Sequence, residues 1–317
     1  LPVDDGLVAA GGTIDLDGDA DLQIAVRDVD IKPFLPLIGK DIKATGSVTG
    51  VINMTGATKN PKVELSASLA NGSYNGIDID QGFVLATMQD HVINVQRIQG
   101  AKGDYKLSVY GRIPLAALYT TGYLDANDSK AMDMTVDFNE AGMAVIPLVT
   151  DTVQDATGAL KGVVHITGTL DQPQAYGTVS VRNGTMKIKS LGNDIKNIDG
   201  DLIFSGQQGD FQSRISMGKG SAGLAAKINW TGHTMTSYRM AAQLEGLNIA
   251  NEYVDGPLNG ELYIAEKDGI PTLMGNLNLE NIKFKIPLAL ESSESTRNIG
   301  IDVNVHAGKN VRLYDKT

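Results

Sequence analysis

An internal repeat is the feature that most constrains how this chain can fold. The segments GSVTGVINMTGATKNPKVELSASLANG (Gly46–Gly72) and GALKGVVHITGTLDQPQAYGTVSVRNG (Gly158–Gly184) align without a gap. A third segment, GPLNGELYIAEKDGIPTLMGNLNLEN (Gly256–Asn281), keeps most of the frame, although Glu266 stands where the second copy has Gly168. A fixed period dictates a repeating architecture, so we expect one structural motif to be stacked several times along the chain.

Apolar residues recur in the same frame at alternate positions, which is the period of a β-strand. Successive side chains on a strand point to opposite faces, so the recurring apolar residues are expected to share one face. Polar residues such as Asn53, Ser180 and Lys283 fall on the other face. The predicted lining of the apolar face is Val48, Ile52, Met54, Leu65, Ala67, Leu69, Leu160, Val164, Ile166, Val179, Val181, Met186, Ile188, Leu258, Leu262, Ile264, Leu277, Leu279, Phe284 and Ile286.

The residues between the apolar runs predict where strands end. Pro61, Pro173 and Pro271 cannot donate a ladder hydrogen bond, so they belong between strands or on an edge. The dipeptides Asn71-Gly72 and Asn183-Gly184 predict hairpin turns.

Short helices are expected between the sheet segments. Asp30–Gly46 and Asn139–Gly158 both precede a copy of the repeat and both end in Ala-Thr-Gly, and Leu247–Gly256 resembles a shorter version. Apolar residues at helical spacing in the second segment favour helices that cap or plug the apolar face, and direct contact with a lipid or a partner is the alternative.

These patterns predict an all-β fold, an elongated repeating antiparallel sheet curled into a trough with a hydrophobic interior. A closed barrel and a two-layer sandwich are the other ways to cover an apolar sheet face. The expected organisation of the 317 residues is a preceding β segment with a short helix (1–45) and three repeats (46–157, 158–255 and 256–317). We expect all four to form one continuous structural unit.

Charge and composition exclude several classes of function. The net charge of −10 gives a nucleic-acid backbone no electrostatic partner, so no nucleic-acid binding is expected. The absence of cysteine excludes disulfides and thiol catalysis. No apolar run approaches the ~20 residues that a membrane-spanning helix needs. Because the chain starts at Leu1 rather than at methionine, we interpret it as a piece of a longer protein.

Each candidate catalytic or metal-binding motif lacks a residue or a spacing that its chemistry requires. Asp15–Gln23 spaces its aspartates like a calcium loop, but Ala20 and Val26 occupy the positions that need glycine and a carboxylate. The glycine-rich Met217–Gly223 lacks the order of a phosphate-binding loop. The four histidines, His91, His165, His233 and His306, have no partner at metal-ligand spacing. We therefore expect no catalytic residue, no metal, no cofactor and no enzymatic activity.

An aliphatic trough without polar groups would suit acyl chains. Burial of aliphatic groups is worth about 0.8 kcal/mol per CH₂ and requires no specific polar partner. A phospholipid would place its tails in the trough and keep its headgroup in water.

The whole pattern from Gly158 to Gly184 resembles the AsmA-like superfamily, and most closely the C-terminal region of the TamB family. The resemblance implies a β-taco fold and the transport of phospholipids between the inner and outer membranes of a diderm bacterium. It also implies a periplasmic location, an inner-membrane anchor and an outer-membrane Omp85-type barrel as partner, the last two through regions outside this chain. The alternative hypothesis is a scaffold that assembles outer-membrane proteins or autotransporters through its strand edges or its groove.

Overall fold

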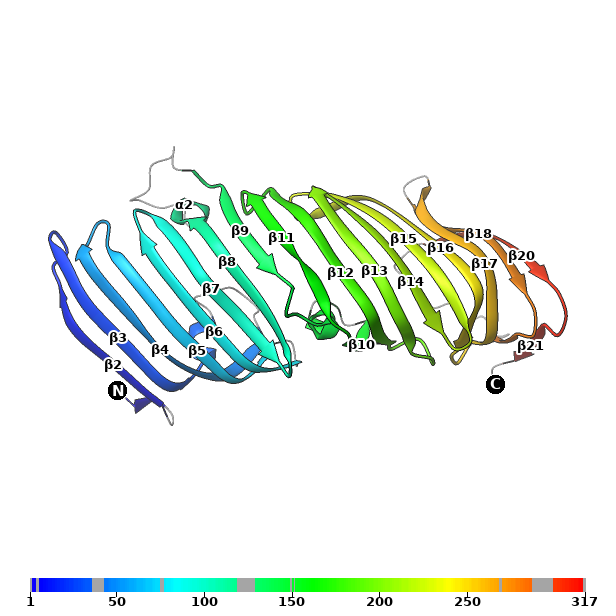
Figure 1. The fold of residues 1–317 in the computed structure, drawn as a ribbon, viewed down its shortest axis with the longest axis horizontal. Coiled ribbons are helices and arrows are strands. Elements are labelled where there is room, and N and C mark those ends of the chain that lie inside the picture. Colours follow the sequence, from blue (N-terminus) through cyan, green and yellow to red (C-terminus); the bar gives the residue numbers. More distant parts are fainter. Residues whose placement is uncertain are drawn as a thin grey trace. The chain divides into compact units, whose positions relative to one another are not determined.

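The computed structural model describes residues 2–3, 6–35, 43–74, 77–118, 129–148, 150, 152–267, 270–286 and 299–315, and nearly all of them lie in β-strands (Figure 1). The chain divides into two compact units. The first unit comprises Leu1–Gly142 and Gly162–Tyr176, and the second comprises Met143–Lys161 and Gly177–Thr317. These bounds do not coincide with those of the sequence repeats, because residues 162–176 of the second copy fall in the first unit and the rest of that copy in the second.

The first unit contains long strands joined in chain order. Its helices are η1 (Lys32–Phe34) and α2 (Leu115–Leu118). Its strands are β1 (Pro2–Val3), β2 (Gly6–Ile14), β3 (Asp19–Asp30), β4 (Ala44–Ala57), β5 (Lys62–Tyr74), β6 (Ile77–Gln89), β7 (Val92–Lys102), β8 (Tyr105–Pro114), β9 (Met132–Asp137) and most of β11 (Leu160–Gly168). From β2 to β9 each strand pairs antiparallel with the next, and β9 then pairs with β11.

The second unit is built in the same way. It contains the 3₁₀ helix η2 (Met143–Leu148). Its strands are β10 (Val153–Thr157), most of β12 (Pro173–Ile188), β13 (Ile195–Gly206), β14 (Gln208–Met217), β15 (Gly220–Thr231), β16 (Thr234–Ala250), β17 (Val254–Lys267), β18 (Ile270–Leu279), β19 (Lys283–Ile286), β20 (Gly300–Ala307) and β21 (Arg312–Asp315). Strands β13 to β18 pair antiparallel in order, whereas β20 and β21 pair parallel with β18 and β19.

In both units the sheet is open and curls without closing on itself, which excludes the barrel. The predicted all-β class and curled antiparallel sheet are therefore confirmed. The two parallel pairings at the last strands are the exception to the antiparallel pattern.

The repeat is visible in the backbone as a recurring β-bulge. Asn71, Asn183 and Asn281 adopt left-handed φ angles of 50°, 57° and 54°. The prediction that Asn71-Gly72 and Asn183-Gly184 form hairpin turns is wrong, because β5 and β12 continue through both dipeptides. In the first copy Thr45 faces Ser73 and Ser47 faces Ala70, so Asn71 and Gly72 together oppose the single residue Gly46. An extra residue of this kind bends a strand without ending it.

The same contacts recur beside each bulge. Thr45 Oγ1 lies 2.7 Å from Ser73 Oγ, and Thr157 Oγ1 lies 2.6 Å from Thr185 Oγ1 at the equivalent position of the second copy. In the third copy an ion pair of 3.8 Å between Lys283 and Asp255 takes this place. The third copy therefore keeps the left-handed asparagine and the cross-strand contact, but its strand is interrupted there, since β18 ends at Leu279 and β19 begins at Lys283.

Helices are shorter than the sequence predicts. In the predicted helix Asp30–Gly46, the structure has the short helix η1. Residues 36–42 of that segment lie outside the described residues. In Asn139–Gly158, η2 occupies one part, but Val153–Thr157 is the strand β10. Pro147 lies inside η2 and cannot supply a helical N–H, which limits the helix to a short turn. The helix predicted at Leu247–Gly256 is wrong, because β16 runs to Ala250 and β17 begins at Val254.

Candidate functional site

In the first unit, apolar side chains form rows that run from strand to strand. Residues directly opposite each other on paired strands lie on the same face of a sheet. One row passes through Ala10, Ile24, Ile52, Leu65, Ala86, Val95, Gly111, Met134 and Ile166. The neighbouring row on this face passes through Val8, Val26, Gly50, Ala67, Val84, Ile98, Val109, Val136 and Val164. We call this the apolar face of the first unit.

The opposite face of the first unit is polar. Its corresponding row is Gln23, Asn53, Glu64, Thr87, Asn94, Arg112, Asp133 and Thr167. Side chains pair along it: Gln23 Nε2 donates to Asn53 Oδ1 at 2.9 Å, and Arg112 lies 3.5 Å from Asp133. The two faces therefore differ sharply in chemistry.

The second unit repeats this division. Its apolar face carries the row Leu202, Phe211, Ala226, Met240, Ile264, Leu273 and Ile301. Its polar face carries the row Asp199, Arg214, Gly223, Gln243, Glu261, Asn276 and Asn304. None of the described residues in the apolar rows of either unit is charged.

The apolar faces are only partly covered. Ile52 and Ile98 remain 38% and 43% exposed in the first unit, and Met240 remains 40% exposed in the second. A groove of about 370 Å³ lies over Val48, Ala67, Leu69 and Val84. A second groove, of about 580 Å³, lies over β13 to β18 in the second unit and is lined entirely by apolar residues and Tyr263. Both faces therefore leave apolar side chains and a groove open to solvent.

The predicted lining residues lie where their alternation places them. On the first unit's face, Val48 faces Leu69, Ile52 faces Leu65, Met54 faces Val63, Ala67 faces Val84, Val164 faces Val136 and Ile166 faces Met134. In the second unit, Leu258 faces Leu279, Leu262 faces Ala242, Ile264 faces Met240, Leu277 faces Val305, Met186 faces Ala156, Ile188 faces Val153 and Phe284 faces Val254. Val179 is half-buried on β12, and Ile286 ends β19 with its side chain outside the described residues.

Some of the predicted residues are too deeply buried to meet a ligand. Leu160, Val164, Val181, Leu258 and Leu279 are each less than 10% exposed. Four of them lie close to the bulges, and the other, Val164, lies on β11 opposite Val136 of β9. A ligand on these faces would instead contact the half-exposed rows through Ile52 and Met240.

Sequence reasoning missed much of the apolar lining because it followed the three repeats alone. Ile24, Val84 and Ile98 in the first unit, and Phe211, Leu224 and Met240 in the second, lie on the same faces but outside the three aligned segments of the repeat. The alternation in DLQIAV and GLAAKINW was the available signal.

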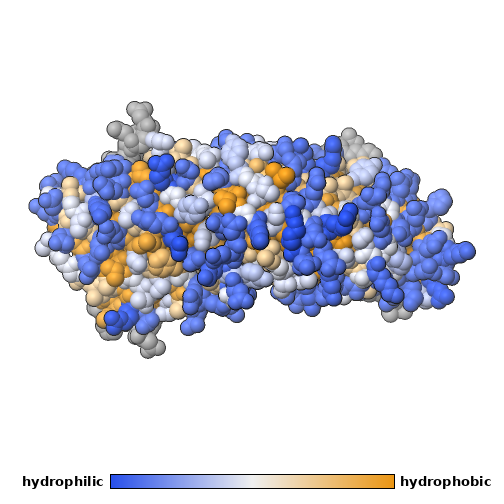
Figure 2. All heavy atoms as spheres, viewed as in Figure 1, coloured by the Kyte–Doolittle hydropathy of each residue, from blue (hydrophilic) through white to orange (hydrophobic). Residues whose placement is uncertain are grey.

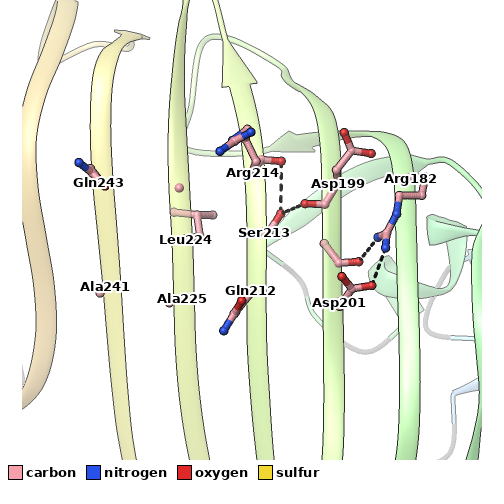
Figure 3. A pocket seen from close by; sticks show the side chains of 12 residues that line it. Arg182, Asp199, Asp201, Gln212, Ser213, Arg214, Leu224, Ala225, Ala241 and Gln243 are labelled. Carbon is pink, nitrogen blue, oxygen red and sulfur yellow. Dashed lines mark hydrogen bonds and ion pairs between the residues drawn. The ribbon is translucent and has the colours of Figure 1, made fainter.

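The polar face of the second unit has a hollow of about 510 Å³ with a floor of small residues (Figure 3). Ala225 and Ala241 lie at its floor, Gly223 also lines it, and Arg214 and Gln243 stand at its sides. Hydrophilic side chains predominate on the molecular face drawn in Figure 2, with hydrophobic ones between them.

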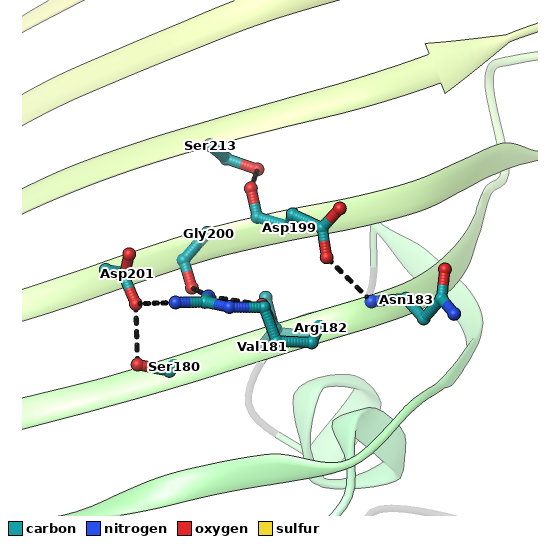
Figure 4. A network of polar contacts seen from close by, with 8 residues as sticks. All are labelled: Ser180, Val181, Arg182, Asn183, Asp199, Gly200, Asp201 and Ser213. Carbon is teal, nitrogen blue, oxygen red and sulfur yellow. Dashed lines mark hydrogen bonds and ion pairs between the residues drawn. The ribbon is translucent and has the colours of Figure 1, made fainter.

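A network beside this hollow joins β12 to β13 (Figure 4). The Arg182 guanidinium donates to the Val181 and Gly200 carbonyl oxygens, each at 2.7 Å, and to Asp201 Oδ1 at 2.8 Å. Ser180 Oγ donates to the same carboxylate at 2.5 Å. The pKa of Asp201 is lowered, most strongly by the hydrogen bond from Ser180 and next by the hydrogen bond from Arg182. With its donors occupied in this way, Arg182 acts as a cross-strand link.

The residues considered for catalysis or metal binding lie apart from one another. His165 Nδ1 lies 3.1 Å from Thr135 Oγ1 on the polar face, and His91 occupies a tight turn with φ of 59°. Asp15 Oδ1 accepts the Asp17 N–H at 3.1 Å, which is turn chemistry. Within the part of the chain that the structure describes, no group of three or more metal-ligating side chains comes together. Over the same residues, no helix has the length and apolar character to cross a membrane.

Comparisons with known proteins add no assignment. No family model, no curated protein and no solved structure matches the chain.

Proposed function

We propose that this chain is a non-enzymatic segment of a phospholipid conduit, and that the apolar face of each unit holds acyl chains. The single observation that carries the proposal is that uncharged apolar rows cross the strands of each unit and leave side chains such as Ile52, Ile98 and Met240 between 38% and 43% exposed. Soluble proteins rarely leave an apolar surface of this extent uncovered unless it binds something.

The energetics favour a lipid over a ligand that needs specific polar contacts. Each CH₂ removed from water contributes about 0.8 kcal/mol, so even partial burial of one acyl chain supplies several kcal/mol. The rows present apolar residues on successive strands with no charged residue among them, so no charge hinders a tail that passes from one strand to the next. A tail is therefore expected to slide across the strands while its headgroup remains in water.

The wider setting is part of the proposal and rests on the resemblance of the repeat pattern to the AsmA-like superfamily. It places the chain in the periplasm of a diderm bacterium, within a longer protein of the TamB type that is anchored in the inner membrane. The conduit would deliver phospholipid toward the outer membrane and meet an Omp85-type barrel through regions outside this chain.

Photo-crosslinking from neighbouring positions tests which face contacts lipid. Benzoylphenylalanine in place of Ile52 or Met240 is expected to label phospholipid in radiolabelled vesicles, because both side chains lie half-exposed in the apolar rows. The adjacent residues Val51 and Ala241 point to the opposite faces and are the matched controls. Equal labelling from both faces, or from neither, would contradict the proposal.

The alternative, a scaffold for outer-membrane protein assembly through strand edges, stays a prediction. Val179→Glu on the apolar face is expected to reduce lipid transfer and leave strand addition at an edge unchanged. The opposite result, intact lipid transfer with loss of client binding, would favour the scaffold.

A further inference from the structure

The strand β20 forms an edge at which the apolar rows of the second unit stop abruptly. In the described part of the chain it pairs with β18 alone, on one side. Ile301 continues the row of Leu273, and Val305 continues that of Leu277. These two side chains are 77% and 55% exposed, so the apolar face reaches the edge without cover.

This edge has little of the usual protection against pairing, because Asp302 is its one carboxylate. Natural edge strands carry prolines, lysines or bulges that prevent another strand from adding to them. Between Gly300 and Ala307 there is no proline or lysine, and the register with β18 is unbroken. The backbone of β20 is therefore a straight, regular template for another strand.

The hydrogen bonds to β18 determine which backbone groups point outward. The Gly308 N–H donates to the Leu279 carbonyl at 2.8 Å, although the residue opposite Leu279 is Ala307. In a parallel pair the bonding residues of a strand alternate, so even-numbered residues bond toward β18. The N–H and C=O groups of Ile301, Val303 and Val305 then face away from the sheet.

We propose that β20 pairs antiparallel with β20 of a second copy of this chain, with Val303 on the two-fold axis. The sequence Ile-Asp-Val-Asn-Val is self-complementary in this register, since Ile301 meets Val305 of the second copy and Asp302 meets Asn304. No two like charges face each other in this register. The backbone groups of Ile301, Val303 and Val305 all hydrogen-bond to the backbone of the second copy. A two-fold axis perpendicular to the sheet keeps both apolar faces on the same side.

The pairing is expected to be weak and reversible. One pair of edge strands buries less area than the 1,200–2,000 Å² typical of stable complexes, so dimers are expected only as the protein concentration rises. The inference does not depend on the proposed function, because it holds whether or not the apolar faces bind lipid.

The absence of cysteine from the chain makes a direct test possible. In an antiparallel hydrogen-bonded pair the two Cα atoms lie about 5.5 Å apart, within the range that a disulfide bridges. Val303→Cys is therefore expected to form a disulfide-linked dimer under mild oxidation. Ile301→Cys and Val305→Cys are expected to stay monomeric separately and to form a mixed dimer when combined.

Sedimentation equilibrium provides a second measurement. The wild-type chain is expected to show a monomer–dimer equilibrium, and Val303→Pro to remain monomeric with unchanged circular dichroism, because proline is tolerated where the N–H faces outward on an edge strand. A wild-type monomer at every concentration would overturn the proposal. So would disulfide formation at Ile301→Cys alone as fast as at Val303→Cys. Larger wild-type oligomers, with no disulfide-linked dimer of the Val303→Cys variant, would also overturn it and would indicate a different partner for this edge.

Discussion

At each copy of the repeat, a glycine packs directly against the bulge of the neighbouring strand. Gly46, Gly158 and Gly256 have φ angles of 135°, 124° and 146°, which side chains rarely permit. A Cβ on Gly158 would lie 2.8 Å from the Cα of Gly184, so the strands could not keep their separation. This geometry needs an asparagine in the left-handed conformation on one strand and a glycine packed against it on the neighbouring strand. That requirement explains why the asparagine and the glycine recur together in each copy.

Gly158→Ala is expected to destabilise the second unit by about 1–3 kcal/mol, because alanine is strained at positive φ and its methyl group meets backbone. The single tryptophan, Trp230, lies in the second unit and reports its unfolding by fluorescence in urea. Gly223→Ala is the matched control, because a Cβ there has open space. Equal midpoints for the two variants would contradict the role given to Gly158.

Asp201 is expected to contribute stability that depends on pH. Its pKa in the folded chain is lowered by Ser180 and Arg182, so its contribution is fully present above the unfolded pKa of about 3.9. The contribution is lost as the pH falls through the lowered, folded-state pKa. The stability difference between wild type and Asp201→Asn should therefore be largest near neutral pH and shrink in acid.

Urea titrations followed through Trp230 at several pH values measure this difference. Asp194→Asn is the control, because Asp194 is exposed and has no side-chain hydrogen bond or ion pair among the described residues. If the Asp201→Asn difference stayed constant down to about pH 2, the network would not stabilise the carboxylate form.

At the scale of elements, the alternation of apolar and polar residues predicts strands well and predicts their interruptions poorly. The alternation assigns Ile52 and Ile264 to the apolar faces on which the structure has them, because a period of two depends only on strand geometry. Asn183-Gly184 is typical of a hairpin turn, but its left-handed asparagine also suits a bulge, and only pairing with the neighbouring strand decides between the two. The helix predicted across Val153 failed for a related reason, because the apolar spacing there comes from η2 followed by β10.

The short helix η2 is expected to act as a structural plug beside the bulge. Met143 is only 2% exposed, its N–H donates to the Gly158 carbonyl at 2.8 Å, and its sulfur lies next to Gly184. Met143→Ala should destabilise the second unit by about 2–5 kcal/mol, because it leaves a cavity. Met235→Ala, at a side chain that is 54% exposed, should change the urea midpoint little. Similar midpoints for both variants would mean that η2 is not packed as described.

At the scale of the whole molecule, the strands form an open, curled sheet whose apolar and polar faces are kept separate over many strands in each of the two units. The sequence predicted this division, since the repeat fixes which residues share a face. It did not predict two compact units, because compactness depends on how many strands pack together and not on the period of the repeat. The broader lining of the faces depends on strands outside the three aligned segments, and only the register assigns those strands to a face.

The central claim, that the apolar faces bind acyl chains, is tested most directly by a pair of double variants with equal charge. Ala67→Glu/Ala226→Glu places one carboxylate on the apolar face of each unit, and Ser66→Glu/Ala225→Glu places them at the adjacent polar-face positions. Each protein is incubated with vesicles of phosphatidylethanolamine and phosphatidylglycerol, re-purified and examined by native mass spectrometry. We predict that the wild type and the polar-face variant carry phospholipid, and that the apolar-face variant retains about tenfold less, since even ~1.4 kcal/mol of lost affinity has that effect. Equal lipid on both variants, or none on the wild type, would contradict the claim.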